Sequence, residues 1–176
     1  MRVLTVKQPW AWAIVHGGKD VENRVRSLGP YRGPVAIHAG LGWSEQGAED
    51  TEVIRAVVSD LNGWPASDLE LWGADTIEPD DWRFDHGAVI GVVDLTDVHP
   101  SADCWRKPWK WETADPVKGD YCSKWAMDDH HHLVLANSRP LPRPIPATGR
   151  LGLWRPDDDL HAAITEQLRP GAEVRS

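Results

Sequence analysis

The segment KQPWAWAIVHGGKDVENR, residues 7–24, places a tryptophan-rich apolar run before two glycines and a charged stretch. Pro9 suits the first turn of a helix, and apolar residues then repeat at helical spacing until Gly17 and Gly18 end the pattern. RVLTVK, just upstream, alternates as a strand does, and DVENR is extended. The segment therefore predicts a strand, a short helix and a second strand.

Outward from this segment the chain alternates short strand patterns with turn-rich connectors. An amphipathic helix is predicted over 44–61, with Ser44 as its N-cap, and a second helix over 157–163. Further strands are predicted at 35–39, 87–100, 131–136 and 149–154, with loops at 62–86 and 101–120. This order predicts an α+β fold built on a small, partly open β-barrel, with a helix between its first two strands and a covering helix.

The composition suits one globular domain. The chain has 176 residues and a formal net charge of -8, with no apolar run long enough to span a bilayer and no signal-peptide pattern, so we expect a cytoplasmic protein without a membrane partner. Cys104 and Cys122 lack the paired spacing typical of zinc sites and are interpreted as reduced structural thiols. No metal or cofactor is expected, and the oligomeric state stays open.

Positive charge is concentrated at the start of this acidic chain. Residues 1–40 carry two acidic side chains and six basic ones: Arg2, Lys7, Lys19, Arg24, Arg26 and Arg32. The overall acidity argues against a protein that coats duplex DNA. The local excess is able to steer a small anionic or nucleotide ligand.

GGKDVENR (17–24) has glycine, lysine, glutamate and arginine in the pattern G-x-K-x-x-E-x-R. At every defined position this pattern resembles the signature of the ASCH domain family, which belongs to the PUA-like superfamily. QPWA (8–11), YRGPVAIHA (31–39), RPL (139–141) and GRLGLW (149–154) resemble further family segments. The resemblance implies one ASCH domain over 1–156 with an inserted region at about 41–86, followed by a helix and tail over 157–176.

The resemblance also implies a cleft beside the N-terminal helix and a family proposed to bind RNA or modified nucleotides. Some relatives are amidohydrolases that deacetylate acetylated cytidine, and at least one is described as a ribonuclease. Those amidohydrolases carry Lys-x-x-Thr where this chain has Lys19 and Glu22. Their catalytic acid lies on a segment that does not align here, so Glu112, Asp115 and Asp120 are positional candidates only.

The charged residues after the glycines are the first candidate site. On a strand, Glu22 and Arg24 face the same way, whereas Lys19, three residues from Glu22, faces the other side unless the chain turns. Glycines at 17 and 18 can supply that turn and admit a ligand close to the backbone. The remaining ligand-binding candidates are Gln8, Trp10, Gly17, Gly18, Arg24, Arg26, Arg32 and His38.

For several candidate functional residues and segments, a purely structural role is an alternative interpretation. His38 points into the cleft or is a hydrogen-bonded histidine at the barrel mouth, and one of Trp10 and Trp12 is a core residue. The run DDHHH (128–132) resembles a metal cluster, but consecutive histidines on a strand alternate faces and cannot all reach one ion, so it is interpreted as a solvated turn leading into a strand. The aromatic and basic segment 105–111 is a second nucleic-acid contact surface or a loop anchored by buried indoles.

Two function classes follow. The first, which we favour, is a module that binds RNA, another single-stranded nucleic acid or a modified nucleoside or nucleotide, with arginines on phosphate or ribose. The second is an amidohydrolase, or a ribonuclease, with Lys19 and Glu22 as tentative catalytic residues. Glu22 opposes the loss of the Lys19 proton, which disfavours catalysis by an uncharged amine.

Overall fold

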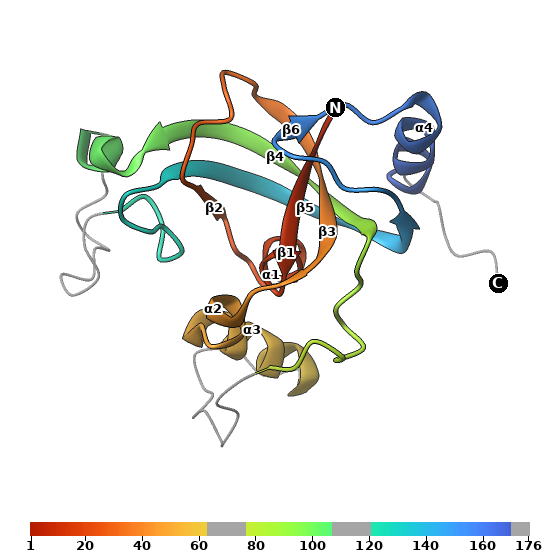
Figure 1. Ribbon diagram of the computed structural model, residues 1–176, viewed down its shortest axis with the longest axis horizontal. Helices are drawn as coiled ribbons and strands as arrows, with labels where there is room; N and C mark the ends of the chain where they lie inside the picture. The colour runs from red at the N-terminus through yellow and green to blue at the C-terminus, as the bar shows by residue number, and fades with distance from the viewer. Residues whose placement is uncertain (63–76, 107–120, 170–176) are drawn as a thin grey trace.

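A six-stranded mixed sheet forms the centre of the computed structural model, which describes residues 1–62, 77–106 and 121–169 (Figure 1). Its strands are β1 (Arg2–Gln8), β2 (Val21–Arg24), β3 (Gly33–Trp43), β4 (Ala88–Pro100), β5 (His131–Pro146) and β6 (Leu153–Trp154). The strand order is β2-β5-β4-β3-β1-β6, and β1 runs parallel to β3 while the other neighbours are antiparallel. Because β2 and β6 lie at opposite edges, the sheet is a half-barrel. The predicted α+β, partly open barrel is confirmed.

The helices are few and short. They are α1 (Trp10–Val15), α2 (Glu45–Ala48), α3 (Thr51–Asn62), the 3-10 helix η2 (Ser101–Arg106) and α4 (Asp158–Gln167). As predicted, α1 connects β1 to β2. Figure 1 shows α2 and α3 together at one end of the sheet and α4 apart from them, beside β5. No helix in the described residues is long and apolar enough to cross a membrane.

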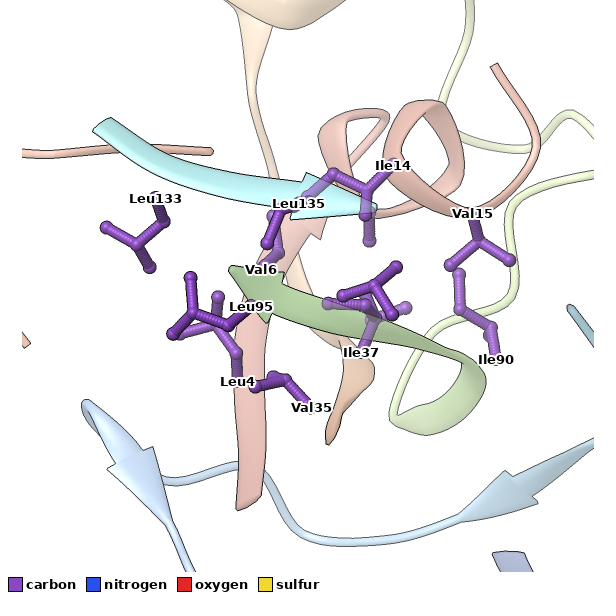
Figure 2. Close-up of a cluster of buried hydrophobic side chains, with 13 residues drawn as sticks. Leu4, Val6, Ile14, Val15, Val35, Ile37, Ile90, Leu95, Leu133 and Leu135 are labelled. Carbon is purple, nitrogen blue, oxygen red and sulfur yellow. The ribbon is translucent and has the colours of Figure 1, made fainter. Parts of the chain in front are cut away.

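The main core lies between α1 and one face of the sheet. Figure 2 shows its side chains converging from α1 and from β1, β3, β4 and β5. Ile14 and Val15 of α1 meet Val35 and Ile37 of β3, which share a face as the alternation predicts. Burial of each such side chain contributes about 1.5–3 kcal/mol. Gly91 lets α1 approach β4 closely, because a Cβ there would lie 2.6 Å from Val15.

The helix predicted over 44–61 is divided into α2 and α3. Ser44 caps α2, as expected, by accepting a hydrogen bond from the Gly47 amide. Asp50 then begins a new helix, since its Oδ1 accepts from the amides of Glu52 at 2.9 Å and Val53 at 3.1 Å. An Asp at this position competes for backbone amides and serves better as a cap than as an interior residue.

Strand β5 continues beyond the predicted strand 131–136, through the proline-rich stretch as far as Pro146. β2 pairs only with residues 131–134 of β5, so the remainder of β5 has β4 on one side and no strand partner on the other in the described structure. Prolines occupy alternate positions there, 140, 142, 144 and 146, and none of them has an amide hydrogen to donate. Proline is tolerated in strands at such edges.

The C-terminal helix packs against the same sheet. Ile164 of α4 is buried with Val3 of β1 and Trp154 of β6 in a cluster on the face away from α1. Asp157 begins α4 by accepting a hydrogen bond from the Leu160 amide at 2.9 Å. Within the predicted loops, residues 101–106 form η2, whereas 63–76 and 107–120 lie outside the described residues.

Candidate functional site

A cleft of about 880 Å³ opens beside the start of α1, at the junction of β1, β2 and β3 with the loop after β5. Residues of these three strands and of the glycine-containing segment 147–152 make up most of its lining. The polar and charged side chains in the lining come from Thr5, Lys7, Glu22, Asn23, Arg24, His38, Ser44, Thr148 and Arg150. Such a volume is typical of a site for one small organic ligand.

Lys19, Glu22 and Arg24 form one ion-paired row at the wall of this cleft. Glu22 lies 3.4 Å from the Lys19 amine through Oε2 and 3.1 Å from the Arg24 guanidinium through Oε1. Glu22 and Arg24 line the cleft, whereas Lys19 lies behind them with its side chain 2% exposed. The cleft therefore presents the carboxylate and guanidinium, and Lys19 holds the carboxylate from the rear.

The chain turn that brings Lys19 to Glu22 is made at Gly18. Gly18 has a φ of +71°, a conformation that side chains rarely adopt, and the Lys19 amide then donates to the Ala13 carbonyl at 2.9 Å. Strand β2 begins only at Val21, so Lys19 does not follow strand alternation. The turn that the two glycines predicted is present.

Burial governs the chemistry of the Lys19 amine. Removal from water lowers its pKa, and the charge of Glu22 partly opposes this shift. The amine also donates to the Val21 carbonyl and lies 5.2 Å from the centre of the Trp10 ring. These contacts point the amine into the protein, away from the open part of the cleft.

His38 lies at the floor of the cleft and is 1% exposed. Its Nε2 donates to the Ala147 carbonyl at 2.9 Å. Nδ1 is buried and has no hydrogen-bond partner in the described part of the chain. A Cβ added at Gly149 would lie 3.0 Å from it, so glycine is what lets the 147–152 segment approach the ring.

The cleft is electropositive although the protein is acidic. Among the described residues, its lining contains three cationic side chains, Lys7, Arg24 and Arg150, and one carboxylate, that of Glu22. Arg150 is placed by its amide, which donates to the Thr5 hydroxyl at 3.2 Å, and its guanidinium lies over the Trp154 ring. A concave surface with this charge balance concentrates anions.

Apolar surface borders the same cleft. Leu41 and Leu151 both line it and are 84% and 99% exposed. Trp10 contributes its ring to the lining while its indole N–H donates to Ser44 Oγ at 3.1 Å. Trp12, in contrast, is buried in the core, as the sequence required of one of the two tryptophans. Exposed apolar side chains beside cations suit a ligand with a flat ring and a charged group.

Several sequence candidates lie away from the cleft. Gln8 is fully buried and structural, because its Oε1 accepts from the Trp12 amide and its Nε2 donates to the Asp85 carbonyl. Arg32 pairs with Asp97 at 3.4 Å, and Arg26 is exposed outside the lining. Gly17 and Gly18 shape the turn and do not line the cleft either.

Sequence reasoning missed many of the residues that line the cleft, among them Thr5, Lys7, Leu41, Thr148, Arg150 and Leu151. The two glycines of GRLGLW could have indicated that residues 149–152 line the cleft, since glycine lets a ligand or another segment approach the backbone closely. Glu112, Asp115, Asp120 and the side chains of segment 105–111 lie outside the described residues.

Comparison with known proteins gives a family and related structures. The ASCH domain family model matches residues 4–137. The crystal structure of ASCH from Zymomonas mobilis covers 93% of this chain and 93% of its own, at 16% identity and a TM-score of 0.47. A point mutant of that protein, with tyrosine changed to phenylalanine, gives the same identity and TM-score and is itself 96% covered. A comparison with curated proteins finds no match.

Proposed function

Since this chain belongs to the ASCH domain family, we propose that its cleft binds a nucleotide or modified nucleoside, either free or as a unit of single-stranded RNA. The observation that carries the proposal is the lining itself, which combines three cations with exposed apolar side chains in a volume of nucleotide size. A nucleotide has the matching parts, a phosphate and a flat base.

The contacts suggest an orientation for the ligand. Arg150 and Lys7 line the cleft and suit the phosphate, which guanidinium and ammonium groups bind through charge-assisted hydrogen bonds. Leu41, Leu151 and the Trp10 ring suit the base, whose faces are apolar. Glu22 is held in place by Lys19 and Arg24 and suits the N–H or O–H donors of a base edge or ribose.

Calorimetric titration with cytidine, N4-acetylcytidine, CMP and a single-stranded RNA hexamer tests the proposal. We expect at least one of these ligands to bind, and Arg150→Ala to weaken binding of the phosphate-bearing ones about tenfold. Arg143→Ala is the matched control, because Arg143 is exposed on β5 and does not line the cleft. Absence of binding by all four ligands at millimolar concentration contradicts the proposal.

One observation supports the alternative hypothesis that the protein is an amidohydrolase. Burial lowers the pKa of Lys19, which an amine acting as base or nucleophile requires. Against it, the amine donates to the Val21 carbonyl and Lys19 does not line the cleft. Release of acetate from acetylcytidine by the wild-type protein, lost in Lys19→Arg with binding retained, is the result that favours catalysis over binding alone.

A further inference from the structure

Four metal-binding side chains meet at the end of the sheet opposite the cleft-forming loop. His99 lies near the end of β4, Cys104 in η2, Cys122 before β5 and His132 in β5. Their ligand atoms all lie within 4.8 Å of one another. We propose that these residues bind one zinc ion as a closed structural site, separate from the proposed nucleotide cleft.

The distances fit tetrahedral coordination. Zinc binds sulfur at about 2.3 Å and nitrogen at about 2.0–2.1 Å, which separates a sulfur from a neighbouring nitrogen by about 3.5 Å. Cys104 Sγ lies 3.2 Å from His99 Nε2 and 3.0 Å from His132 Nδ1, and Cys122 Sγ lies 3.5 Å from the same Nδ1. Small movements of the side chains admit the ion at the centre.

The second nitrogen of each imidazole is also held as a zinc ligand requires. His99 Nδ1 lies 2.9 Å from the Asp97 carboxylate, and His132 Nε2 lies 2.7 Å from the Met127 carbonyl. A ring that donates to these acceptors directs its other lone pair at the cluster. Both histidines are thus oriented by a partner outside the cluster, with their ligand atoms turned inward.

Hydrogen bonding alone accounts for this cluster less well than a cation does. The single proton of a Cys104 thiol serves His99 Nε2 or His132 Nδ1, but not both. If it serves His99, the Cys122 thiol must serve His132 Nδ1 across 3.5 Å, while Cys104 Sγ lies closer to that nitrogen, at 3.0 Å, with no proton between them. His132 is 0% exposed, and Cys104 and His99 are buried too. One Zn²⁺ with two thiolates and two neutral imidazoles satisfies all four groups without leaving net charge in this buried position.

Four protein ligands leave no open position, so the ion is structural and not catalytic. The site is well placed to stabilise edge strand β2, which has only four residues. His132 is opposite His99 on β4 and opposite Asn23 on β2. Asn23 in turn donates to the Trp125 carbonyl and accepts from the Met127 amide, both in the segment between Cys122 and His132.

The four proposed zinc ligands do not have the sequence spacing of a known zinc motif, so the sequence did not predict the site. The two cysteines are 18 positions apart, and the DDHHH run contributes only His132. The argument that consecutive histidines cannot share an ion holds, because His131 is not part of the cluster. The other ligands come from distant segments that β4 and β5 pairing brings together.

Metal analysis of the full chain, purified under reducing conditions from zinc-supplemented cells, tests the site. We expect about one zinc per chain. After chelation, Co²⁺ alone should restore one metal per chain, with the intense visible absorption of tetrahedral cobalt and a thiolate-to-cobalt charge-transfer band. Zinc should also raise the melting temperature of the metal-free protein, because it binds only the folded site.

Variants separate the four ligands from their neighbours. Cys104→Ser and Cys122→Ser should weaken the charge-transfer band, and His132→Gln should lower the zinc content below about 0.1 per chain, whereas His131→Gln should keep one zinc. If a ligand variant does not fold, the cobalt spectrum of the wild-type chain decides. Zinc below about 0.1 per wild-type chain with no charge-transfer band, or a Cys104–Cys122 disulfide and no metal uptake after reduction, overturns the proposal.

Discussion

The Glu22 carboxylate lies 3.4 Å from the Lys19 amine, and the two side chains are 9% and 2% exposed. The pair lies at the point where the α1–β2 turn meets the cleft, and Arg24 shares the same carboxylate. One buried amine therefore holds the acidic group that the cleft presents to a ligand. A change at Glu22 should therefore affect both the stability of the fold and the binding of a ligand in the cleft.

Glu22→Gln should destabilise the fold by about 3–5 kcal/mol, because it leaves the Lys19 amine buried without its counter-ion. The double variant Lys19→Met/Glu22→Gln should cost less than the sum of the two single variants, since it removes both charges. Urea unfolding followed by tryptophan fluorescence measures all three. A Glu22→Gln variant within about 1 kcal/mol of the wild type would show that the pair is not a buried unit.

The stability difference between the wild type and Lys19→Met should increase with pH toward 10.5. Burial lowers the pKa of Lys19 below its ordinary value of 10.5. Between the folded and unfolded pKa values, the unfolded chain binds more protons, so the free energy of unfolding rises with pH, by at most about 1.4 kcal/mol per pH unit. Lys19→Met lacks this slope.

Other groups that titrate below pH 10.5 contribute equally to the free energy of unfolding of the wild type and of Lys19→Met, so their contributions cancel in the difference. Tyr121 is one of them: its ordinary pKa of 10.0 applies to the unfolded chain, and its hydrogen bond to Asp128 raises the pKa to about 12 in both folded proteins. Denaturant unfolding at several pH values from 7 to 10 measures the difference. Parallel pH profiles for the wild type and Lys19→Met contradict a lowered Lys19 pKa.

Gly149→Ala should reduce ligand affinity about tenfold, because the new Cβ would lie 2.8 Å from His38 Cε1 and 3.0 Å from Thr5. These contacts push the 147–152 segment from its place in the cleft wall. Gly152→Ala is the control, since Gly152 also lines the cleft and has a φ of +69°, but a Cβ there meets no atom within 4 Å.

Gly152→Ala should cost about 1–2 kcal/mol of stability through backbone strain while affinity of the folded protein is retained. Titration of both folded variants with the ligand identified for the wild type compares them. Equal affinity for the two variants would mean that the approach of Gly149 to His38 does not shape the site.

Binding of a short single-stranded RNA should weaken with added salt, and Lys7→Ala should flatten the slope of log K against log salt by about 0.7, because Lys7 lines the cleft. Arg32→Ala should leave the slope unchanged, since Arg32 pairs with Asp97 outside the cleft. Fluorescence anisotropy at five salt concentrations gives the slopes. If Arg32→Ala flattens the salt slope and Lys7→Ala does not, the RNA binds on another surface.

The sequence by itself determined the local elements at the start of the chain. Alternation over 2–7, helical spacing over 10–15 and the glycines after it each depend on neighbours within a few residues, so β1, α1 and the turn to β2 were predictable. The motif containing Lys19, Glu22 and Arg24 was visible for the same reason. Its members lie within six positions, and one turn brings them together.

Tertiary structure alone decided which distant residues share a site. Arg24 and Arg32 are both basic residues of the N-terminal region, and the sequence offered both as ligand-binding candidates. Asp97, 65 positions away, holds Arg32 outside the cleft. The 147–152 segment, in contrast, brings Arg150 to Thr5 in the cleft lining. The two histidines and two cysteines of the proposed zinc site extend from position 99 to 132 and meet because β4 pairs with β5. Strand pairing depends on the burial of whole faces, which no local pattern specifies.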